Sequence, residues 1–162
     1  MNISQITEED FKSFWPTLKL IIEAEETYAF DPQMSFEQAH HLWCGIPQVT
    51  YVAKEDDVIL GSYYLKPNMA GPGSHVCNCG YMVTPAARGK GVARRLCEHS
   101  QDVAKELGYL AMQFNSVVSS NDIAVKLWQK LGYEIIGTIP QGFRHKKLGL
   151  VDSYIMYKQL NP

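Results

Sequence analysis

Two glycines flanked by basic residues form a candidate binding site for a phosphorylated ligand. Gly89 and Gly91 alternate with Arg88 and Lys90, shortly after an apolar run that ends at Val83. Glycines leave the backbone open to the close approach of an anion, and the basic side chains add positive charge. The residues that follow have a helical pattern, and the first turn of a helix presents unpaired N–H groups and the positive end of its dipole. The segment therefore predicts a cradle for a diphosphate.

The same segment also fits a plain tight turn, in which the glycines serve only the backbone conformation. It is not a P-loop, because the spacing G-x-x-x-x-G-K-[ST] is absent. It is not a full dinucleotide-binding motif either, because Arg94 stands where G-x-G-x-x-G requires its third glycine. The motif by itself leaves both readings open.

Three asparagines and a tryptophan are further candidates for residues that contact a ligand. Asn78 and Asn115 each lie inside an apolar, strand-like run, where an amide must find partners or destabilise the fold. A bound ligand is one such partner, and a neighbouring loop is the structural alternative. Asn121 is by default a helix N-cap and can still face a ligand. Trp128 lies on an apolar stripe, where a core role is the usual one.

Hydrophobic periodicity divides the chain into the helices and strands that position these residues. In the N-terminal third, Thr7 caps a first helix, which Pro16 is expected to kink or restart, and Ser35 opens a second. Two later helices end at Gly108 and Gly132. The predicted strands are residues 49–54, 58–65, 75–83, 109–118, 133–139 and 152–160. This order predicts a mixed α/β sheet in a single domain spanning residues 1–162.

Composition narrows the class of protein. The chain has 162 residues, of which 46% are hydrophobic, so it can bury a core. Fifteen Lys and Arg against seventeen Asp and Glu give a net charge of -2, which argues against nucleic acid or an anionic membrane as the main partner. The chain shows no apolar run of membrane-spanning length and no signal peptide. Four cysteines do not form a disulfide framework at this length, so a reducing, cytoplasmic location is expected.

Two other clusters of polar residues are expected to have a structural and not a ligand-binding role. His75, Cys77 and Cys79 alternate along one predicted strand, but a fourth ligand and the usual C-x-x-C spacing are missing. We therefore expect buried thiols and no metal. Residues 144–147, a run of four basic side chains, are predicted to form a solvated loop, with contact to an anionic ligand as the alternative.

The glycine segment and a second motif together resemble the Gcn5-related (GNAT) N-acetyltransferases. Residues 88–93 fit the family signature [RQ]-x-x-G-x-[GA], and residues 121–133 are similar to its second motif. The two motifs stand in the family's order, and the resemblance covers residues 49–160. It implies a mixed, mostly antiparallel sheet of about seven strands with flanking helices. Two of these strands would part near Val83 and Val117 to admit acetyl-CoA.

The resemblance also implies roles for particular residues. Acetyl-CoA would be the acetyl donor and a small-molecule amine the acceptor. The Val83 N–H would donate to the developing oxyanion. Trp128 stands where relatives often carry a tyrosine that protonates the departing thiolate, so the thiolate leaves unassisted or takes its proton from another group, with Tyr81 the nearest candidate. The implied cofactor-binding residues are Met82, Val83, Arg88, Gly89, Lys90, Gly91, Val92, Ala93, Asn121 and Trp128.

A closer resemblance is to the fungal acetyltransferases that detoxify azetidine-2-carboxylate, an analogue of proline. It rests on residues 77–83 followed by the glycine segment, and on residues 113–115 followed by Asn121, six positions after Asn115. In that subfamily two asparagines hold the carboxylate of a small imino acid. Here they would be Asn78 and Asn115, and Tyr81 would line the pocket.

Several alternatives stay open. An amino or imino acid is the favoured acceptor, against an aminoglycoside, a polyamine or a protein N-terminus. Trp128 in place of the usual tyrosine also keeps open a non-catalytic CoA-binding regulatory domain. The general base is not assigned: His75, Glu134, Asp152 and a chain of waters are all candidates, and positioning alone can supply much of the acceleration. A homodimer is likewise open.

Overall fold

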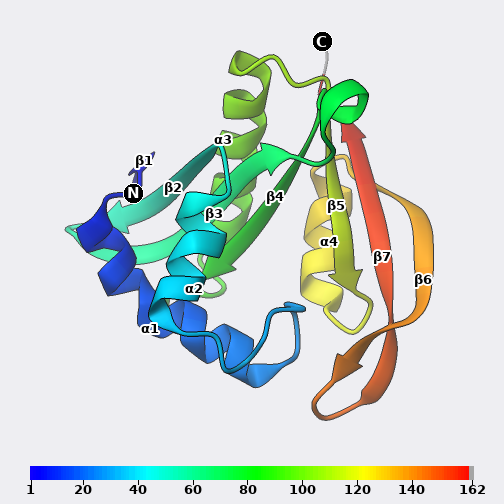
Figure 1. Ribbon diagram of the computed structural model, residues 1–162, viewed down its shortest axis with the longest axis horizontal. Coiled ribbons are helices and arrows are strands. Elements are labelled where there is room, and N and C mark those ends of the chain that lie inside the picture. The colour runs from blue at the N-terminus through cyan, green and yellow to red at the C-terminus, as the bar shows by residue number, and fades with distance from the viewer. Residues whose placement is uncertain (161–162) are drawn as a thin grey trace.

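Seven strands form one mixed sheet with helices on both faces in the computed structural model, which describes residues 1–160 (Figure 1). The strand order is β1-β2-β3-β4-β5-β7-β6, and only the β4–β5 pair is parallel. The strands are β1 (Asn2–Gln5), β2 (Val49–Glu55), β3 (Val58–Pro67), β4 (Val76–Val83), β5 (Ala111–Val118), β6 (Glu134–His145) and β7 (Gly149–Gln159). The helices are α1 (Glu8–Ala24), α2 (Phe36–His40), α3 (Val92–Glu106) and α4 (Asp122–Lys130). The predicted fold class is confirmed.

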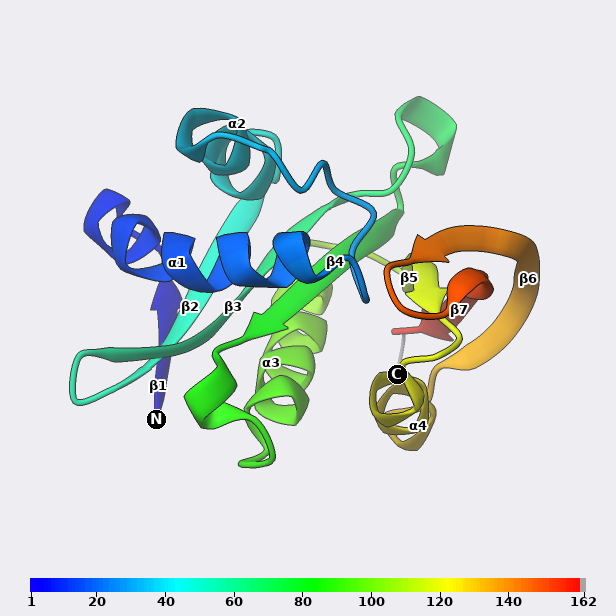
Figure 2. The same ribbon diagram turned by 90° about the horizontal axis from the view of Figure 1, so that it is seen from below.

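Each face of the sheet carries its own apolar core. On one face α1 and α2 cover β3 and β4, and on the other face α3 lies across the same strands while α4 lies beside β5 and β7 (Figure 2). The first core contains Phe11, Phe14, Leu18, Trp43, Tyr64 and Met82. The second core contains Tyr63, Cys79, Leu96, Met112, Phe114, Trp128 and Tyr133. Because side chains alternate along a strand, successive residues of β4 reach opposite cores.

Helix α1 begins where the sequence predicts it. The Thr7 hydroxyl accepts a hydrogen bond from the Asp10 N–H (3.1 Å), and the Asp10 carboxylate accepts one from the Thr7 N–H (3.0 Å). The expected restart at Pro16 is wrong, since one helix continues to Ala24. Phe14 and Leu18 on either side of the proline pack into one core while its ring stays exposed, and this packing keeps the helix continuous.

Both ends of the sheet differ from the prediction. The helical N-terminal third in fact starts with β1, which is only four residues long and gains its order from pairing with β2. Strand β6 continues to His145, so the first half of the run 144–147 lies in a strand and not in a solvated loop. In the turn that follows, the Lys146 N–H donates to the Glu25 carbonyl (3.1 Å). Together with the ion pair between Lys147 and Glu26 (3.2 Å), this bond joins the hairpin tip to the end of α1.

The parallel strands β4 and β5 part soon after they meet. Their pairing is limited to Val76 with Ala111 and Cys77 with Met112. Further along, β5 bulges between Phe114 and Val117 in its ladder with β7. The two strands therefore diverge and open the sheet at its centre.

The remaining expectations concern cysteines, metals and membranes. All four cysteines are free, and Cys77, Cys79 and Cys97 are buried as small apolar groups. Within residues 1–160, no group of three or more metal-ligating side chains comes together. Across the same residues, no helix has the length and hydrophobicity that crossing a bilayer requires.

Candidate active site

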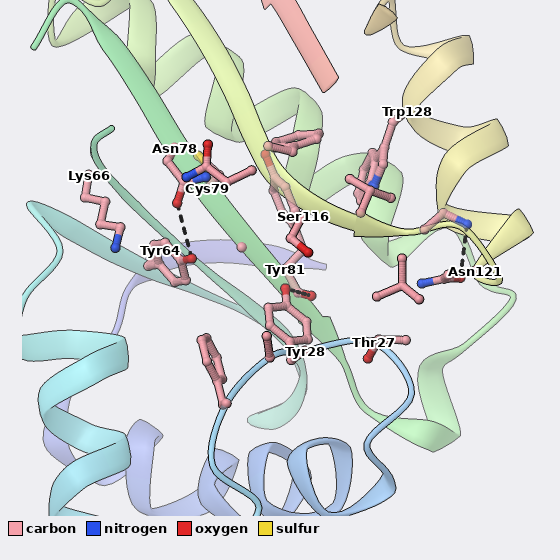
Figure 3. A pocket seen from close by; sticks show the side chains of 18 residues that line it. Thr27, Tyr28, Tyr64, Lys66, Asn78, Cys79, Tyr81, Ser116, Asn121 and Trp128 are labelled. Atoms are coloured by element: carbon pink, nitrogen blue, oxygen red, sulfur yellow. Dashed lines mark hydrogen bonds between the residues drawn. The ribbon is translucent and has the colours of Figure 1, made fainter. Parts of the chain in front are cut away.

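A cavity of about 300 Å³ lies where β4 and β5 part (Figure 3). Its walls come from both strands, from the end of β3, from residues 27–30 after α1, and from α4. Lys66 and Asn78 lie at one end of the cavity, and Asn121 and Trp128 lie toward the other. Side chains from both faces of the sheet thus meet in one space.

Asn78 is buried at the end of the cavity near β3. Its Oδ1 accepts a hydrogen bond from the Tyr64 hydroxyl (3.3 Å), and its Nδ2 donates to the Gln113 carbonyl (2.9 Å). The second bond bridges β4 and β5 just beyond their last paired residues. One Nδ2 hydrogen remains for another acceptor. The structural and the functional readings of Asn78 are therefore compatible.

Asn115 lines the same cavity from β5 but is exposed. Its Nδ2 donates to Oδ1 of Asn68 (2.7 Å), and its own Oδ1 accepts from Nε2 of Gln113 (3.0 Å). Gln113 thus contacts both asparagines, through its carbonyl and through its side chain. The structure brings the two predicted asparagines to the same cavity and leaves each with one N–H to offer.

The ring of Tyr81 lines the cavity, but its hydroxyl group is hydrogen-bonded to Ser100 on α3. Its hydroxyl lies 2.7 Å from Ser100 Oγ, and because Ser100 already donates to the Cys97 carbonyl (2.7 Å), Tyr81 is the donor. Burial raises the pKa of this phenol well above its usual value, which makes it a weaker acid. Tyr81 is therefore ill-suited to the role of proton donor, although its ring lines the cavity.

Tyr28 ties the segment after α1 to β4. Its hydroxyl donates to the Tyr81 carbonyl (2.7 Å). The Tyr81 carbonyl lies on the edge of β4 that faces β5, beyond the last residues at which the two strands pair. The bond from Tyr28 fixes residues 27–30 along one side of the cavity, where they form part of the lining (Figure 3).

The Val83 N–H points into the gap between the strands. The Thr84 N–H donates to the Leu60 carbonyl (2.9 Å) on β3. Main-chain groups of an antiparallel ladder alternate in direction from one residue to the next, so those of Val83 point away from β3. The predicted oxyanion donor thus has no strand partner on that side.

Helix α4 positions Trp128 and its N-cap residue Asn121 at the far end of the cavity. The Trp128 ring is buried, with its centroid 5.1 Å from that of Tyr81 and 5.3 Å from that of Phe114. The Asn121 side chain caps α4 by accepting a hydrogen bond from the Ala124 N–H (3.3 Å). Both residues therefore have the structural roles expected by default, and both also line the cavity.

The glycine cradle has the conformation that only glycine adopts easily. Gly89 has φ +77 and Gly91 has φ +76, and a Cβ at either position would have no atom within 4 Å. Gly91 is the N-cap of α3 and makes no side-chain capping bond, so the first-turn N–H groups are free of side-chain partners. Arg88 and Lys90 are exposed beside them. An open, positively charged helix N-terminus of this kind fits an anion.

Three other predicted cofactor contacts involve the main chain more than the side chain. The Met82 side chain is buried in the core beneath α1, and the side chain of Val92, the first residue of α3, is buried in the core on the other face of the sheet. Only their backbone groups are left for a ligand. Ala93 follows in the first turn of α3 and is half-buried.

No carboxylate or imidazole side chain lines the cavity within residues 1–160. Among the described residues that line it, Lys66 alone carries a charge, and no Asp, Glu or His takes part. His75, Glu134 and Asp152, which the sequence left as candidate bases, are exposed and lie outside the lining. Burial raises the pKa of Tyr64 to about 12, so this phenol stays protonated near neutral pH.

Sequence reasoning missed the contributions of Lys66, Tyr64 and the segment 27–30. Lys66 lies opposite Asn78 in the β3–β4 ladder, so a correct hairpin register would have found it. Tyr64 is two residues away on the same face of β3. The segment 27–30 has no signal of its own beyond a turn-like composition.

A central sheet that opens between its two parallel strands, with a glycine-rich helix start following one of them, is the architecture of N-acetyltransferases that use an acyl-CoA. Residues 5–133 match the acetyltransferase (GNAT) family. The chain belongs to this family and is an N-acetyltransferase.

Individual relatives agree with this assignment. A Gcn5-related N-acetyltransferase from Kribbella flavida is 42% identical, with a TM-score of 0.93 over 98% of this chain and 96% of that one. N-acetyltransferase aca1 of Schizosaccharomyces pombe is 31% identical over 151 residues, which cover 83% of this chain and 72% of that protein. The Salmonella typhimurium protein yncA, solved with its cofactor acetyl-CoA, shares the fold at 21% identity, with a TM-score of 0.84 over 100% of this chain and 95% of that one.

Proposed function

We propose that the protein transfers the acetyl group of acetyl-CoA to the amine of a small amino or imino acid. The observation that carries this proposal is the cavity between β4 and β5. The glycine cradle follows the end of β4, whereas the neutral amide of Asn78 lies near the beginning of β4 and that of Asn115 lies midway along β5. Donor and acceptor would therefore approach one another along the gap.

The residues present suit the proposed cofactor. Gly89 and Gly91 leave open space where any other residue would place a Cβ, so a diphosphate could approach the backbone there. Arg88 and Lys90 would add positive charge, and α4 would contribute Asn121 and Trp128. Bound acetyl-CoA would supply an acetyl group activated as a thioester.

In this proposal two residues act on the reacting atoms or beside them. The Val83 N–H would donate to the oxygen on which negative charge develops during acyl transfer. Trp128 would shape the cavity by packing, because an indole N–H is a donor but not a useful acid. The departing thiolate would then leave without protonation by a side chain.

The lining of the cavity also determines how the amine loses its proton. An amine attacks only in its neutral form, and no carboxylate or imidazole among the described lining residues is placed to remove the proton. The chain would therefore select the neutral amine from solution, or pass its proton to water. Its own contribution would be orientation and the exclusion of competing geometries.

Asn78 and Asn115 favour an acceptor that carries a carboxylate. Each amide retains one N–H after its observed hydrogen bonds, and both residues line the same cavity, one from β4 and one from β5. Such donors suit a carboxylate on a small acceptor. L-azetidine-2-carboxylate is the first compound to test, because of the closer resemblance described above.

The deciding experiment measures thiol release from acetyl-CoA with a panel of acceptors. The panel contains L-azetidine-2-carboxylate, L-proline, glycine, putrescine, an aminoglycoside and a peptide with a free N-terminus. We expect the highest kcat/KM for an amino or imino acid. Preference for the polyamine, the aminoglycoside or the peptide would overturn the acceptor class. Acetyl-CoA binding by calorimetry without turnover on any amine would point instead to a regulatory CoA-binding domain.

A reducing compartment is part of the same proposal. Its support is that all four cysteines are free and that three of them are buried in the cores. Such thiols stay reduced in the cytoplasm.

A further inference from the structure

Lys66 is the one formal charge among the described residues that line the cavity. It is half-buried near the end of β3, and its Nζ lies 5.5 Å from the centroid of the Tyr64 ring. None of the ion pairs found within residues 1–160 involves it. A half-buried lysine side chain without a carboxylate partner among these residues, at the edge of a cavity, is suited to an anionic ligand.

Lys66 lies at the end of the cavity proposed to bind the acceptor, and not at the end proposed to bind the cofactor. In the β3–β4 ladder it stands opposite Asn78, so the two side chains lie on the same face of the sheet. Figure 3 shows Lys66, Tyr64 and Asn78 together at one end, away from Trp128 and Asn121. The face concerned is the one covered by α1 and α2, whereas the glycine cradle leads into α3.

The asparagines alone provide few donors for a carboxylate. An ionised carboxylate has about four lone-pair sites. Asn78 and Asn115 each have one free N–H, because the other N–H of each amide is bonded to Gln113 or Asn68. The Lys66 ammonium adds three donors and a full charge beside them.

We propose that Lys66 binds the carboxylate of the acceptor and selects amines that carry an anionic group close to the reacting nitrogen. This inference rests on the proposed function and gives it a specificity residue. The neutral asparagines then orient the acceptor, while Lys66 supplies most of the discrimination between an acid and its neutral analogue. An electrostatic contact in a partly enclosed cavity acts mainly on acceptor affinity, and therefore on KM.

The test compares one acceptor with its neutral analogue in four forms of the enzyme. The acceptor is the amino or imino acid with the highest kcat/KM in the panel, and the analogue is its carboxamide. The variants are Lys66→Met, Lys66→Arg and the matched control Lys19→Met. Lys19 is an exposed lysine of α1, outside the cavity, so its replacement removes the same charge from the surface only.

We expect Lys66→Met to lower kcat/KM for the acid about ten- to a hundredfold, mainly through KM, because it removes a charged hydrogen bond. The value for the carboxamide and the KM for acetyl-CoA should stay within about threefold. Lys66→Arg should retain most of the activity on the acid, and Lys19→Met should behave as wild type. Lys66→Gln, which keeps a polar side chain, should show the same selective loss if the methionine variant folds poorly.

The outcomes separate this inference from the function on which it rests. Equal losses for the acid and the carboxamide, or no loss for either, would overturn the role of Lys66 while the acetyltransferase activity stands. A wild-type enzyme that prefers the carboxamide to the acid would overturn it as well. Absence of turnover on every acceptor of the panel would overturn the proposed function itself.

Discussion

Replacing Gly80 by alanine should displace Tyr64 and disturb the acceptor end of the cavity. A Cβ on Gly80 would stand 2.6 Å from Cε1 of Tyr64 and 2.9 Å from its Cζ. The two residues face each other in the β3–β4 ladder. The Tyr64 ring cannot move toward Trp43, whose ring packs edge-on against it with centroids 5.0 Å apart, so it would have to shift into the cavity that it lines. Gly80 is therefore required by a close approach and not by a turn.

The size of the effect follows from two losses and one gain. Forcing extra volume into a packed core costs about 1–3 kcal/mol, and losing the hydrogen bond from Tyr64 to Asn78 costs about 1 kcal/mol more. The alanine restricts the unfolded chain and returns about 0.4–1 kcal/mol. We expect a net decrease of about 1–3 kcal/mol in the free energy of unfolding.

Urea denaturation measures the stability change, and Gly137→Ala is the matched control. Gly137 lies within β6, and a Cβ there would meet its nearest atom at 3.6 Å, which is ordinary contact. The control should change stability by less than about 0.5 kcal/mol. Because Asn78 loses its partner, Gly80→Ala should also lower kcat/KM for the acceptor about tenfold or more, with little effect on acetyl-CoA binding.

A double-mutant cycle tests the physical cause. In a Tyr64→Ala background the clash is absent, so adding Gly80→Ala should cost much less than it does in the wild type. If Gly80→Ala is as mild as Gly137→Ala, or if its cost is the same in both backgrounds, the assignment of Gly80 to a close approach with Tyr64 is refuted.

Three further outcomes follow from the site. Gly91→Val and Gly149→Val both place a valine at positive φ in open space and should lose similar stability in denaturation, about 1–3 kcal/mol, but only Gly91→Val should abolish CoA binding in calorimetry. Trp128→Phe should keep kcat within about tenfold of wild type in the thiol-release assay, since its role is packing; a folded variant that loses more than about a hundredfold would show that the indole N–H takes part in the reaction. For two acceptors whose ammonium pKa values differ, kcat/KM should rise with pH and level off at each acceptor's own pKa, because the neutral amine reacts; levelling at one common pH would reveal a base on the enzyme.

Much of the local structure could be predicted because its causes lie within a few residues. The caps at Thr7 and Ser35 are satisfied by side chains three positions away. Gly108 and Gly132 follow helices at φ +88 and +96, where glycine is the natural residue. The two family motifs are of the same kind, since each combines a helix terminus with the residues next to it. Fold class and family follow from these signals.

The asparagines were predictable only in part. Their polarity inside apolar runs identified Asn78 and Asn115 as unusual, and the structure brings both to one cavity. Their partners were not predictable, because Asn78 bonds to the Gln113 carbonyl, 35 positions along the chain, and to Tyr64 on another strand. Contacts of that kind depend on the register of the ladders, which a single sequence specifies only weakly.

The sequence by itself thus determined the alternation of elements, the glycine cradle and the membership of a family, because these depend on local backbone preferences and on hydrophobic periodicity. Only the tertiary structure decided which way Tyr81 directs its hydroxyl, where the run 144–147 packs, and which charge lies beside Asn78. Tyr81 finds Ser100 on α3, the hairpin tip finds the end of α1, and Lys66 reaches the cavity through the pairing of β3 with β4. Each of these placements arises between segments far apart in the chain, where packing and strand register, and not local propensity, select the partner.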